Sequence, residues 1–278
     1  MELSIIIVSW NVKDKLQENL KALFSSKVNF PFEVFVVDNA SSDKSAEMVA
    51  INFPQVKLIS NSENFGFARA NNQAIKQAQG RFILLLNPDM RVEADTLRNA
   101  IAWVKVNPQA TVSGFKLVNE KGEIVKQVRR FPKVFDQLMI ILKIPHFLPF
   151  VLNSYLYKNF NYEKSAKVDS IRGAFFLINR EAYQKINPGV LPLLDERYFI
   201  WFEEVDFCRS VYKMGGEVWY SPVATCLDYV GASFSQVKRA KTQNYFRDSM
   251  LEYFKKWEKR CEYIILKSAW NFVLFFIK

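Results

Sequence analysis

The sequence has few of the residues that crosslink a small protein or bind a structural metal. Its 278 residues include only three cysteines, Cys208, Cys226 and Cys261, and one histidine, His146. An odd number of scattered cysteines, without the paired spacing of metal ligands, excludes a disulfide framework and indicates a reducing compartment. We expect three buried or inert thiols and a structural or interfacial role for His146, which lies in an irregular stretch.

Long apolar runs are also absent. No stretch reaches the roughly 18 to 20 uninterrupted apolar residues that a membrane-spanning helix requires. Residues 134–152 and 263–277 come partway, but charged, polar or proline residues interrupt both. The apolar run at 1–8 follows no basic region and precedes no small-residue cleavage site, so it predicts a first strand rather than a signal peptide. We therefore expect a cytoplasmic protein, peripheral at most on the inner face of the cell membrane.

Acidic residues are outnumbered by basic ones, 28 against 38, which gives a formal net charge of +10. Such an excess attracts nucleic acid, anionic lipid headgroups or a phosphorylated substrate. The sequence has no zinc-finger spacing, aromatic RNA-binding signature or basic zipper region, so no nucleic-acid partner is expected. Basic residues gather at 238–241 and 255–260, before the apolar tail. This arrangement fits either a membrane surface or a solvated helical face that ends in a core-packed tail.

Short apolar runs alternate with helical patterns from residue 1 to about 115. This alternation predicts an α/β fold with a mostly parallel sheet flanked by helices. Strands are expected at 3–8, 33–37, 56–59 and 82–86, and helices at about 16–24, from about 42, at 67–79 and at 94–106. Residues 82–86 are apolar throughout, as in a strand covered on both faces, so this strand is expected at the centre of the sheet.

The second half of the chain is less regular. A hairpin is expected at 116–125 with its turn at 119–122, and residues 129–168, which mix prolines and bulky apolar residues without a period, are interpreted as a variable insertion. A strand at 170–178, a helix at 205–214, two short strands within 216–229 and a helical tail from 238 to 277 complete the expectation. The boundaries of the expected units are 1–115, 116–235 and 236–278.

Polar residues follow the predicted strands, at the sheet edge where ligands bind to an open parallel sheet. The sets are Ser9 and Asn11 after the first strand, Asp38, Asn39 and Ser41 after the second, Asn64 and Gly66 after the third, and Asn87 and Asp89 after the fourth. The first turn lacks the Gly-x-Gly-x-x-Gly pattern, which argues against a dinucleotide-dependent dehydrogenase.

Two of these aspartates have the clearest chemistry. Asp38 can accept hydrogen bonds from a base N–H or a ribose hydroxyl. The alternative for Asp38, a helix cap, is weaker because Ser42 and Asp43 supply better caps. Pro88 stiffens its turn, so Asp89 projects over the sheet edge in a fixed direction. One carboxylate with diphosphate oxygens and waters is a typical Mg²⁺ or Mn²⁺ site, and a plain turn aspartate is the alternative.

Several segments form an ordered set along the chain. They are Val8-Ser9-Trp10-Asn11, Val37-Asp38-Asn39, Asn64-Phe65-Gly66-Phe67-Ala68, Asn87-Pro88-Asp89, Arg172-Gly173-Ala174-Phe175, Leu194-Asp195-Glu196-Arg197-Tyr198-Phe199 and Glu203-Glu204-Val205-Asp206. Together they cover roughly residues 3–234 and resemble the family-two glycosyltransferases. Within that family the pattern is similar to the rhamnosyltransferase-like branch, in which Asn-Pro-Asp stands in for the usual Asp-x-Asp.

The resemblance implies a GT-A fold and a role for each unit. Residues 1–115 correspond to the nucleotide-sugar-binding half of the GT-A domain. Residues 116–235 correspond to the acceptor-binding and catalytic half, whose insertion at 129–168 would face the acceptor or a membrane. The helical tail at 236–278 could associate with a membrane.

The resemblance also implies roles for single residues. Asp38 would contact the nucleotide base, Asp89 would bind the metal, and Glu204, beside Glu203, would deprotonate the acceptor hydroxyl. The alternative for Glu203 is a carboxylate that only stabilises the helix dipole at the start of a helix. Asp228 stands where the family usually has a histidine before a Gly-x-Ser turn, and we assign it as a further metal ligand. The other residues assigned to nucleotide binding are Ser9, Asn11, Asn39, Ser41, Asn64, Gly66, Arg69 and Asn87. Those assigned to the acceptor or sugar are Arg172, Gly173, Trp201 and Asp206.

The implied activity is an inverting, metal-dependent glycosyl transfer. A sugar would move from a nucleotide-diphospho-sugar, dTDP-rhamnose or a UDP-sugar, to a hydroxyl of a glycan or lipid-linked acceptor in cell-envelope polysaccharide synthesis. Two alternatives stay open. Asp228 in place of the histidine favours an inactive nucleotide-sugar-binding homologue, and the insertion and apolar tail favour a membrane-peripheral scaffold of a polysaccharide assembly complex.

Overall fold

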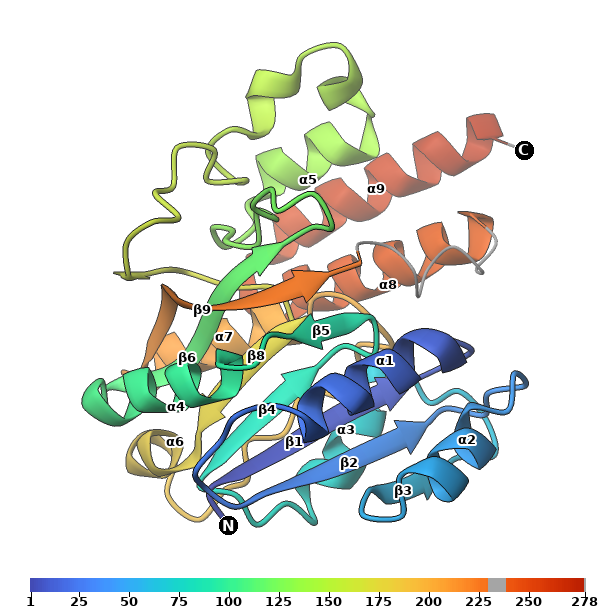
Figure 1. Ribbon diagram of the computed structural model, residues 1–278. Coiled ribbons are helices and arrows are strands. Elements are labelled where there is room, and N and C mark those ends of the chain that lie inside the picture. Colours follow the sequence, from blue (N-terminus) through green and yellow to red (C-terminus); the bar gives the residue numbers. More distant parts are fainter. Residues whose placement is uncertain (230–238, 278) are drawn as a thin grey trace.

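The fold is built on one mixed sheet with helices on both faces (Figure 1). The computed structural model describes residues 1–229 and 239–277, with the side chains of 239–240 and 274–277 excepted. The expected Gly-x-Ser turn and Lys238 therefore lie outside the described residues. Within the described chain, the strand order is β3-β2-β1-β4-β8-β6-β9-β5, and β7 pairs with β9.

The N-terminal half forms the parallel part of the sheet, as expected. Its strands are β1 (Leu3–Ser9), β2 (Phe32–Asp38), β3 (Lys57–Ser60) and β4 (Phe82–Leu86). The register places Ser9 opposite Asp38 and Asp38 opposite Ser60, so the polar residues after these strands meet at one edge. All five residues of β4 are buried between β1 and β8, which confirms its central place.

Alternate residues of the strands pack against different helices, because successive side chains point to opposite faces of a sheet. Ile5 and Ile7 belong to a cluster that α1 (Lys13–Phe24), α2 (Ser45–Asn52) and α4 (Thr96–Val106) cover. Ile6 belongs to a second cluster that α3 (Phe67–Ile75), α6 (Arg180–Ile186) and α7 (Glu203–Lys213) cover. The expected helices at the start of the chain are thereby confirmed, apart from their ends.

Two ends differ from expectation for local reasons. Helix α3 ends at Ile75 rather than at residue 79, and its final turn tightens, since the amide of Gln77 donates to the carbonyl of Ala74. Helix α2 begins at Ser45 because Asp43 caps it from outside: the Asp43 carboxylate accepts hydrogen bonds from the amide and the hydroxyl of Ser45.

The second half adds the antiparallel strands. Strand β8 (Phe175–Asn179) runs antiparallel to β4 and to β6 (Ala110–Val118), and β9 (Glu217–Asp228) lies parallel to β6. The short strands β5 (Met90–Val92) and β7 (Ala166–Lys167) pair with β9. Because β6 crosses residue 115, the two expected halves share one continuous sheet. The turn expected at 119–122 is present, with the amide of Gly122 donating to the carbonyl of Asn119.

Three expectations for this half are corrected. The two short strands expected within 216–229 are one strand, β9, whose pairing with β6 shifts between Phe115 and Lys116. Pro222, which lacks an amide donor, lies at that irregularity. The strand expected at 170–178 begins only at Phe175, and the helix expected at 205 begins at Glu203.

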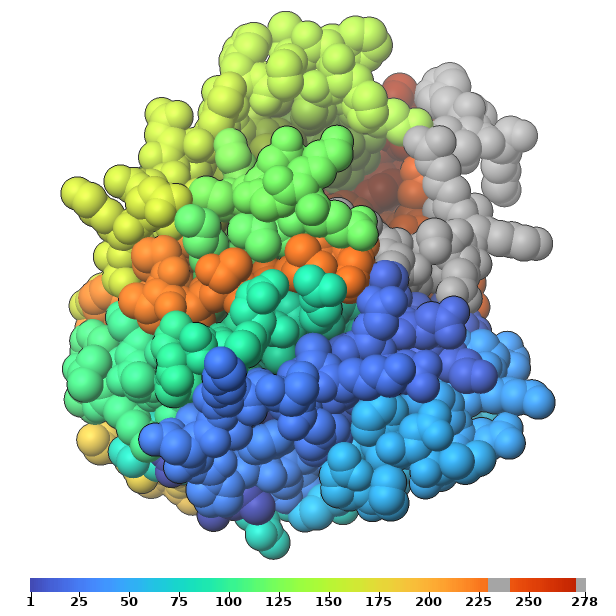
Figure 2. Space-filling model, viewed as in Figure 1, coloured from blue at the N-terminus to red at the C-terminus, as the bar shows by residue number. Residues whose placement is uncertain are grey.

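The insertion and the tail form a helical layer beside the sheet. The insertion contains α5 (Val134–Ile141) and two 3₁₀ turns, η1 (Ile144–His146) and η2 (Pro149–Leu152), and the tail is two helices, α8 (Arg239–Trp257) and α9 (Arg260–Ile277). A third apolar cluster joins them to the segment before α7 through Ile141, Phe202, Phe254 and Trp270. No described helix is long and apolar enough to cross a membrane. Figure 2 shows the insertion as an upper lobe above the N-terminal half.

The three cysteines and the histidine differ in their exposure to solvent. Cys208 and Cys226 are buried, and Cys261 is exposed. Burial raises the pKa of both buried thiols, so they stay protonated and unreactive at neutral pH. His146 is exposed in η1.

Candidate functional site

A pocket of about 610 Å³ opens where the strand ends meet the segment before α7 and the start of α8. The sequence-predicted residues that line it are Asn39, Asn64, Gly66, Asn87, Arg172, Gly173, Trp201, Glu203 and Glu204. Residues separated by more than 160 positions along the chain therefore share one cavity.

The other sequence-predicted residues do not line the pocket. Ser9, Asn11, Asp38 and Ser41 lie at the ends of β1 and β2, and Asp89 and Asp228 lie beside the turn after β4. Arg69 is exposed on α3, with its guanidinium 4.0 Å from the ring centroid of Phe65. The structure thus brings Asn39, Asn64, Gly66 and Asn87 of the strand-end set together with the acid pair in one pocket, and it leaves Arg69 outside.

The loops after β1 and β2 brace one another. The amide of Asn11 donates to the hydroxyl of Ser41 at 2.9 Å, and the side-chain oxygen of Asn11 accepts from the amide of Ser42 at 2.7 Å. Asp43 accepts from the amides of Lys13 and Ser45, so one carboxylate caps both α1 and α2. These contacts make the strand-end edge a preformed surface.

Asp38 has an unsatisfied oxygen at this edge. Its side chain is 3 % exposed, and its Oδ2 accepts from the amide of Ser41 at 3.0 Å. Its Oδ1 is buried and has no hydrogen-bond partner among the described residues. Because a buried acceptor without a donor is costly, this atom is suited to a donor that a ligand brings.

Gly66 is required where α3 meets the far wall of the pocket. Its φ is +81°, and a Cβ added there would lie 2.3 Å from the carbonyl oxygen of Phe199. That same carbonyl accepts from the amide of Phe67 at 2.7 Å, and the side-chain amide of Asn39 donates to the carbonyl of Gly66 at 3.1 Å. The close approach of the two backbones therefore fixes the width of the pocket.

The Asn-Pro-Asp turn is held from two sides. The amide of Asn87 donates to the carbonyl of Ala174, and the side-chain amide of Asn19, on α1, donates to the carbonyl of Asn87 at 2.9 Å. The backbone carbonyl of Asp89 accepts from the amide of Tyr229, next to Asp228. The turn is thereby attached to the end of β9.

Asp89 and Asp228 are the candidate metal ligands. Both side chains are buried, and Met90, next to Asp89, pairs with Asp228 across β5 and β9. Arg172 contacts Asp228 with 2.9 Å between Nη1 and Oδ2. Among the described residues no group of three or more histidine, cysteine or acidic side chains gathers as a metal cluster. Two buried carboxylates, Asp89 directly before β5 and Asp228 at the end of β9, still fit a hard cation that takes its other ligands from diphosphate and water.

The acid pair opens helix α7 after a strained backbone. Trp201 and Phe202, with φ of 64° and 66°, are both in the left-handed region, which is rare for bulky residues and is found where a site imposes its geometry. Glu203 is buried and Glu204 is partly buried, and Oε2 of each has no partner among the described residues. Two carboxylates therefore face the pocket in a preset orientation.

The surroundings of the acid pair favour the protonated form. Burial, the neighbouring Glu204 carboxyl and Asp206 raise the pKa of Glu203 well above its ordinary value. Burial also raises the pKa of Glu204, while backbone hydrogen bonds and the positive charge of Arg172 oppose the rise. A carboxylate whose pKa moves toward neutrality is suited to accept a proton.

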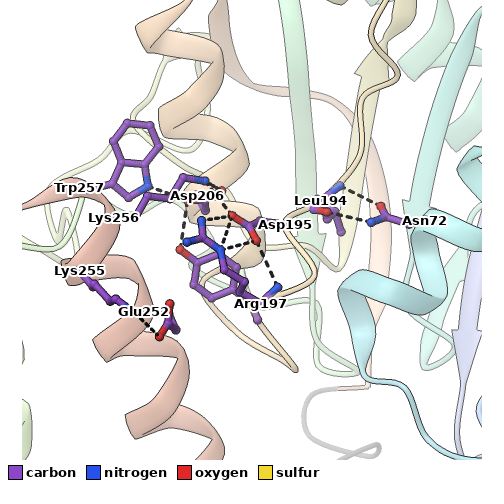
Figure 3. A network of polar contacts seen from close by, with 10 residues as sticks. Asn72, Leu194, Asp195, Arg197, Asp206, Glu252, Lys255, Lys256 and Trp257 are labelled. Carbon is purple, nitrogen blue, oxygen red and sulfur yellow. Dashed lines mark hydrogen bonds and ion pairs between the residues drawn. The ribbon is translucent and has the colours of Figure 1, made fainter.

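Asp206 does not line the pocket, and it connects α7 to α8 instead (Figure 3). Its carboxylate accepts from Lys256 at 2.7 Å, from the indole of Trp257 at 2.6 Å and from the Tyr198 hydroxyl at 3.1 Å. Lys256 also contacts Asp195 at 3.0 Å. Burial alone would raise the pKa of Asp195, but hydrogen bonds from Arg197 and Lys256 outweigh it, and the pKa is lowered.

The same segment is anchored to α3. Asn72 donates to the carbonyl of Leu194 at 2.8 Å and accepts from the amide of Leu194 at 2.9 Å (Figure 3). Farther along, Ser249 on α8 donates to the carbonyl of Ile200 at 2.8 Å. Residues 194–202, which lead into the acid pair, are therefore held from both ends.

Sequence reasoning missed the pocket residues that come from the tail and from this segment. Lys241 and Tyr245 on α8 line the pocket with Phe199, and the rings of Tyr245 and Phe199 stack with centroids 4.3 Å apart. No sequence signal could have found Lys241 or Tyr245, because they belong to a helix with no motif and reach the pocket only through packing.

Comparisons with known proteins identify the family and the fold. A family model described as glycosyl transferase family 2 matches residues 4–186. An N-acetylglucosaminyl-diphospho-decaprenol L-rhamnosyltransferase of Mycobacterium tuberculosis is 23% identical over 239 residues, which cover 82% of this chain and 76% of that protein. A rhamnosyltransferase of Escherichia coli is 24% identical over 256 residues, which cover 87% of this chain and 90% of that protein.

A solved structure shares the fold. The mannosyltransferase of Pyrobaculum calidifontis, in complex with GDP-Man and Mn²⁺, matches with a TM-score of 0.60 and 17% identity, over 98% of this chain and 69% of that chain. The expected GT-A architecture and the resemblance stated above are confirmed. The family model spans more than half of the sequence, and the chain belongs to glycosyl transferase family 2.

Proposed function

We propose that this protein is an inverting glycosyltransferase that moves a sugar from dTDP-rhamnose or a UDP-sugar to a hydroxyl of a glycan or lipid-linked acceptor. The setting is cell-envelope polysaccharide synthesis at the inner face of the membrane. The observation that carries the proposal is the pocket itself, which has polar strand-end residues on one wall and the acid pair on the other. The rhamnosyltransferase relatives support the choice of sugar.

The donor nucleotide binds at the edge formed by β1 and β2. The free Oδ1 of Asp38 accepts a hydrogen bond from a base N–H, which uracil and thymine both offer. Ser9, Asn11, Ser41 and the pocket-lining amides Asn39, Asn64 and Asn87 surround the nucleotide and the sugar. Arg69, which is exposed and stacks on Phe65, reaches the donor only by leaving that contact.

Asp89 and Asp228 would hold Mg²⁺ or Mn²⁺ together with diphosphate oxygens. When bound, the cation would supply positive charge to the departing diphosphate. Arg172, paired with Asp228, adds a fixed positive charge at the same wall of the pocket. Gly173, next to Arg172, leaves room there, since a Cβ added to it would be in ordinary contact with Phe67 and Glu204.

Glu204 acts as the general base. It takes the proton of the acceptor hydroxyl, the acceptor oxygen forms a bond to the anomeric carbon, and the bond from that carbon to the diphosphate oxygen breaks. The nucleoside diphosphate leaves with the electron pair. One in-line displacement inverts the anomeric configuration. Trp201, which lines the pocket directly before the acid pair, presents its ring to the acceptor sugar.

Calorimetric titration of UDP and of dTDP, with and without Mn²⁺, tests the donor site. We expect one nucleotide to bind in a metal-dependent manner, and Asp89→Ala to abolish that binding. Asp95→Ala is the matched control, because Asp95 is half-exposed and pairs with Arg98 on the surface. If the folded protein binds neither nucleotide, the transferase proposal is wrong.

One contact favours a second candidate, a nucleotide-sugar-binding homologue without turnover. Arg172 occupies an oxygen of Asp228, the residue that stands at the usual histidine position. In that case the protein binds donor but neither transfers nor hydrolyses the sugar. Release of nucleoside diphosphate from the donor, followed by proton NMR of the product anomer, separates the two candidates.

A further inference from the structure

Exposed large apolar side chains concentrate in the insertion. Phe135, Leu142, Phe147, Leu148 and Phe150 lie within α5, η1, η2 and the residues between them, and the exposed fraction reaches 83% for Phe147 and 62% for Phe150. Soluble proteins seldom expose such side chains as a group, and a group of them marks an interaction surface.

Helix α9 extends this apolar surface. It packs beside α5 (Figure 1), and it exposes Ile264 and Ile265. The opposite side of α9 is occupied, since Leu266 and Trp270 are buried in the cluster that joins α5, α8 and the segment before α7. The two helices and the 3₁₀ turns therefore present one layer to the outside.

The insertion and the residues that flank it also carry an excess of positive charge. Residues 126–167 contain eight basic residues against the acids Asp136 and Glu163, of which Asp136 is buried and Glu163 pairs with Lys116. Exposed Lys143 lies within residues 134–152, Lys133 lies directly before them, and α9 adds exposed Arg260 and Lys267. Lys126, Arg130, Lys158 and Lys164 are exposed in the flanking residues, whereas Lys167 pairs with Glu217. A partner for this surface must offer both an apolar phase and negative charge.

We infer that the surface formed by residues 134–152 and α9 docks on an anionic phospholipid bilayer. Phe147, Leu148 and Phe150 enter the boundary between headgroups and acyl chains, and the surrounding lysines contact the lipid phosphates. In peripheral proteins, segments that combine apolar and basic residues bind the membrane surface. No described helix of this chain is long and apolar enough to span a membrane. Lysine is depleted at protein–protein interfaces, so the exposed Lys133, Lys143 and Lys267 favour a lipid over a protein partner.

This docking surface lies one helical layer from the pocket. Ile141 of α5 and Leu266 of α9 share a cluster with Tyr198 and Phe202, which precede the acid pair. Tyr155 of the insertion lies within electrostatic range of the acid pair: burial raises the pKa of Tyr155 to about 12, the positive charge of Arg129 opposes that rise, and the Glu204 carboxyl adds to it. Provided that the proposed transfer is correct, the bilayer then holds a lipid-linked acceptor close to Glu204.

Co-sedimentation of the full chain with lipid vesicles tests the docking surface without donor or acceptor. We expect binding to vesicles that contain phosphatidylglycerol, at least tenfold weaker binding to phosphatidylcholine alone, and loss of binding as salt rises. The double variant Phe147→Ser, Phe150→Ser should bind phosphatidylglycerol vesicles at least tenfold more weakly. The matched control is Ile51→Ser, Val106→Ser, which removes apolar side chains that are 69% and 77% exposed on α2 and α4.

Each outcome bears on the inference. Because the replaced side chains are exposed, both double variants should keep the thermal midpoint of the wild type, and the vesicle result can be compared directly. If the wild type does not bind anionic vesicles, or if Phe147→Ser, Phe150→Ser binds like the control, the inference is wrong. If the wild type instead dimerises in sedimentation velocity and only this variant is monomeric, the surface serves self-association and the inference is equally wrong.

The docking inference and the proposed function fail separately. Calorimetric titration of UDP or dTDP into the same variants reports on the donor site, which lies on the other wall of the pocket. A wild type that binds nucleotide but no anionic vesicles would overturn the membrane surface alone. Vesicle binding by a folded protein that binds no nucleotide would overturn the transfer reaction alone.

Discussion

At the residue scale, the chemistry of the pocket depends on two adjacent carboxylates that the fold partly deprives of solvent. Replacing Glu204 by glutamine keeps its size and removes its basicity. We expect Glu204→Gln to lower the transfer rate by about 10² to 10⁴, the usual worth of general base catalysis, with unchanged nucleotide affinity. Initial rates and calorimetry on the same preparation check this. A variant that transfers at the wild-type rate would rule out Glu204 as the base.

The buried Glu203 carboxyl should make the free energy of unfolding depend on pH. Its pKa in the folded protein is raised above the ordinary value of 4.5, so folding favours its protonated form. The stabilisation is fully present below pH 4.5 and is lost as the pH rises through the folded pKa. Within that window the wild type should lose about 1.4 kcal/mol of unfolding free energy per pH unit relative to Glu203→Gln. Urea unfolding of both proteins across the pH range measures the difference, and parallel curves would contradict it.

Gly66 tests the close approach of α3 to Phe199. Gly66→Ala places an alanine at a φ that is strained for any residue with a side chain, and its Cβ would lie 2.3 Å from the carbonyl oxygen of Phe199. We therefore expect a loss of roughly 2 to 4 kcal/mol in unfolding free energy. Gly122→Ala is the control, because Gly122 has a φ of +78° with nothing within 4 Å of the added Cβ. The control should lose only about 1 kcal/mol from strain. Equal losses would mean that the contact with Phe199 is unimportant.

At the element scale, α8 orients the segment that leads into the acid pair. Lys256 bridges Asp195 and Asp206, so Lys256→Met leaves the buried Asp206 charge less compensated beside Glu203. We expect the acidic limb of the pH–rate profile to move to higher pH, and kcat at neutral pH to fall, while donor affinity stays unchanged. These changes would identify Lys256 as a positioning residue rather than a purely structural one.

The neighbouring lysine supplies the control for that experiment. Lys255, on the same helix, pairs with Glu252 at 3.6 Å and with no other acid in the described part of the chain, and its own side chain is 63% exposed (Figure 3). An exposed pair of this kind contributes little, so Lys255→Met should leave both the rate and its pH profile unchanged. If both variants behave alike, α8 does not position the acid pair.

At the scale of the whole molecule, the tail completes the core. Met250, Tyr253 and Phe254 of α8 are buried against Tyr198 and Phe202. Deleting residues 239–277 uncovers these aromatic rings and removes two residues from the pocket wall. We expect the truncated chain to bind a hydrophobic dye and to unfold without a sharp transition, as dye fluorescence and calorimetry would show. A truncated chain with the wild-type midpoint would contradict this.

The features of this protein that depend on local pattern could be predicted from its amino-acid sequence alone. Continuous apolar runs marked β1, β2 and β4, and the polar residues after them marked the ligand edge, because strand ends meet in a parallel sheet whatever the rest of the chain does. The end of helix α3 and the bulge in strand β9 could not be predicted from the sequence, because caps, tightened turns and register shifts depend on neighbours in space.

Contacts between residues that are far apart in the chain could be identified only in the folded protein. Asp206 stood in a motif beside the acid pair, yet its side chain points to Lys256 and Trp257, fifty positions away. Lys241 and Tyr245 line the pocket, and Arg172 forms an ion pair with Asp228, through packing that no sequence periodicity predicts. The raised pKa values of Glu203 and Glu204 belong to the same class, because burial and neighbouring charge exist only once the chain has folded.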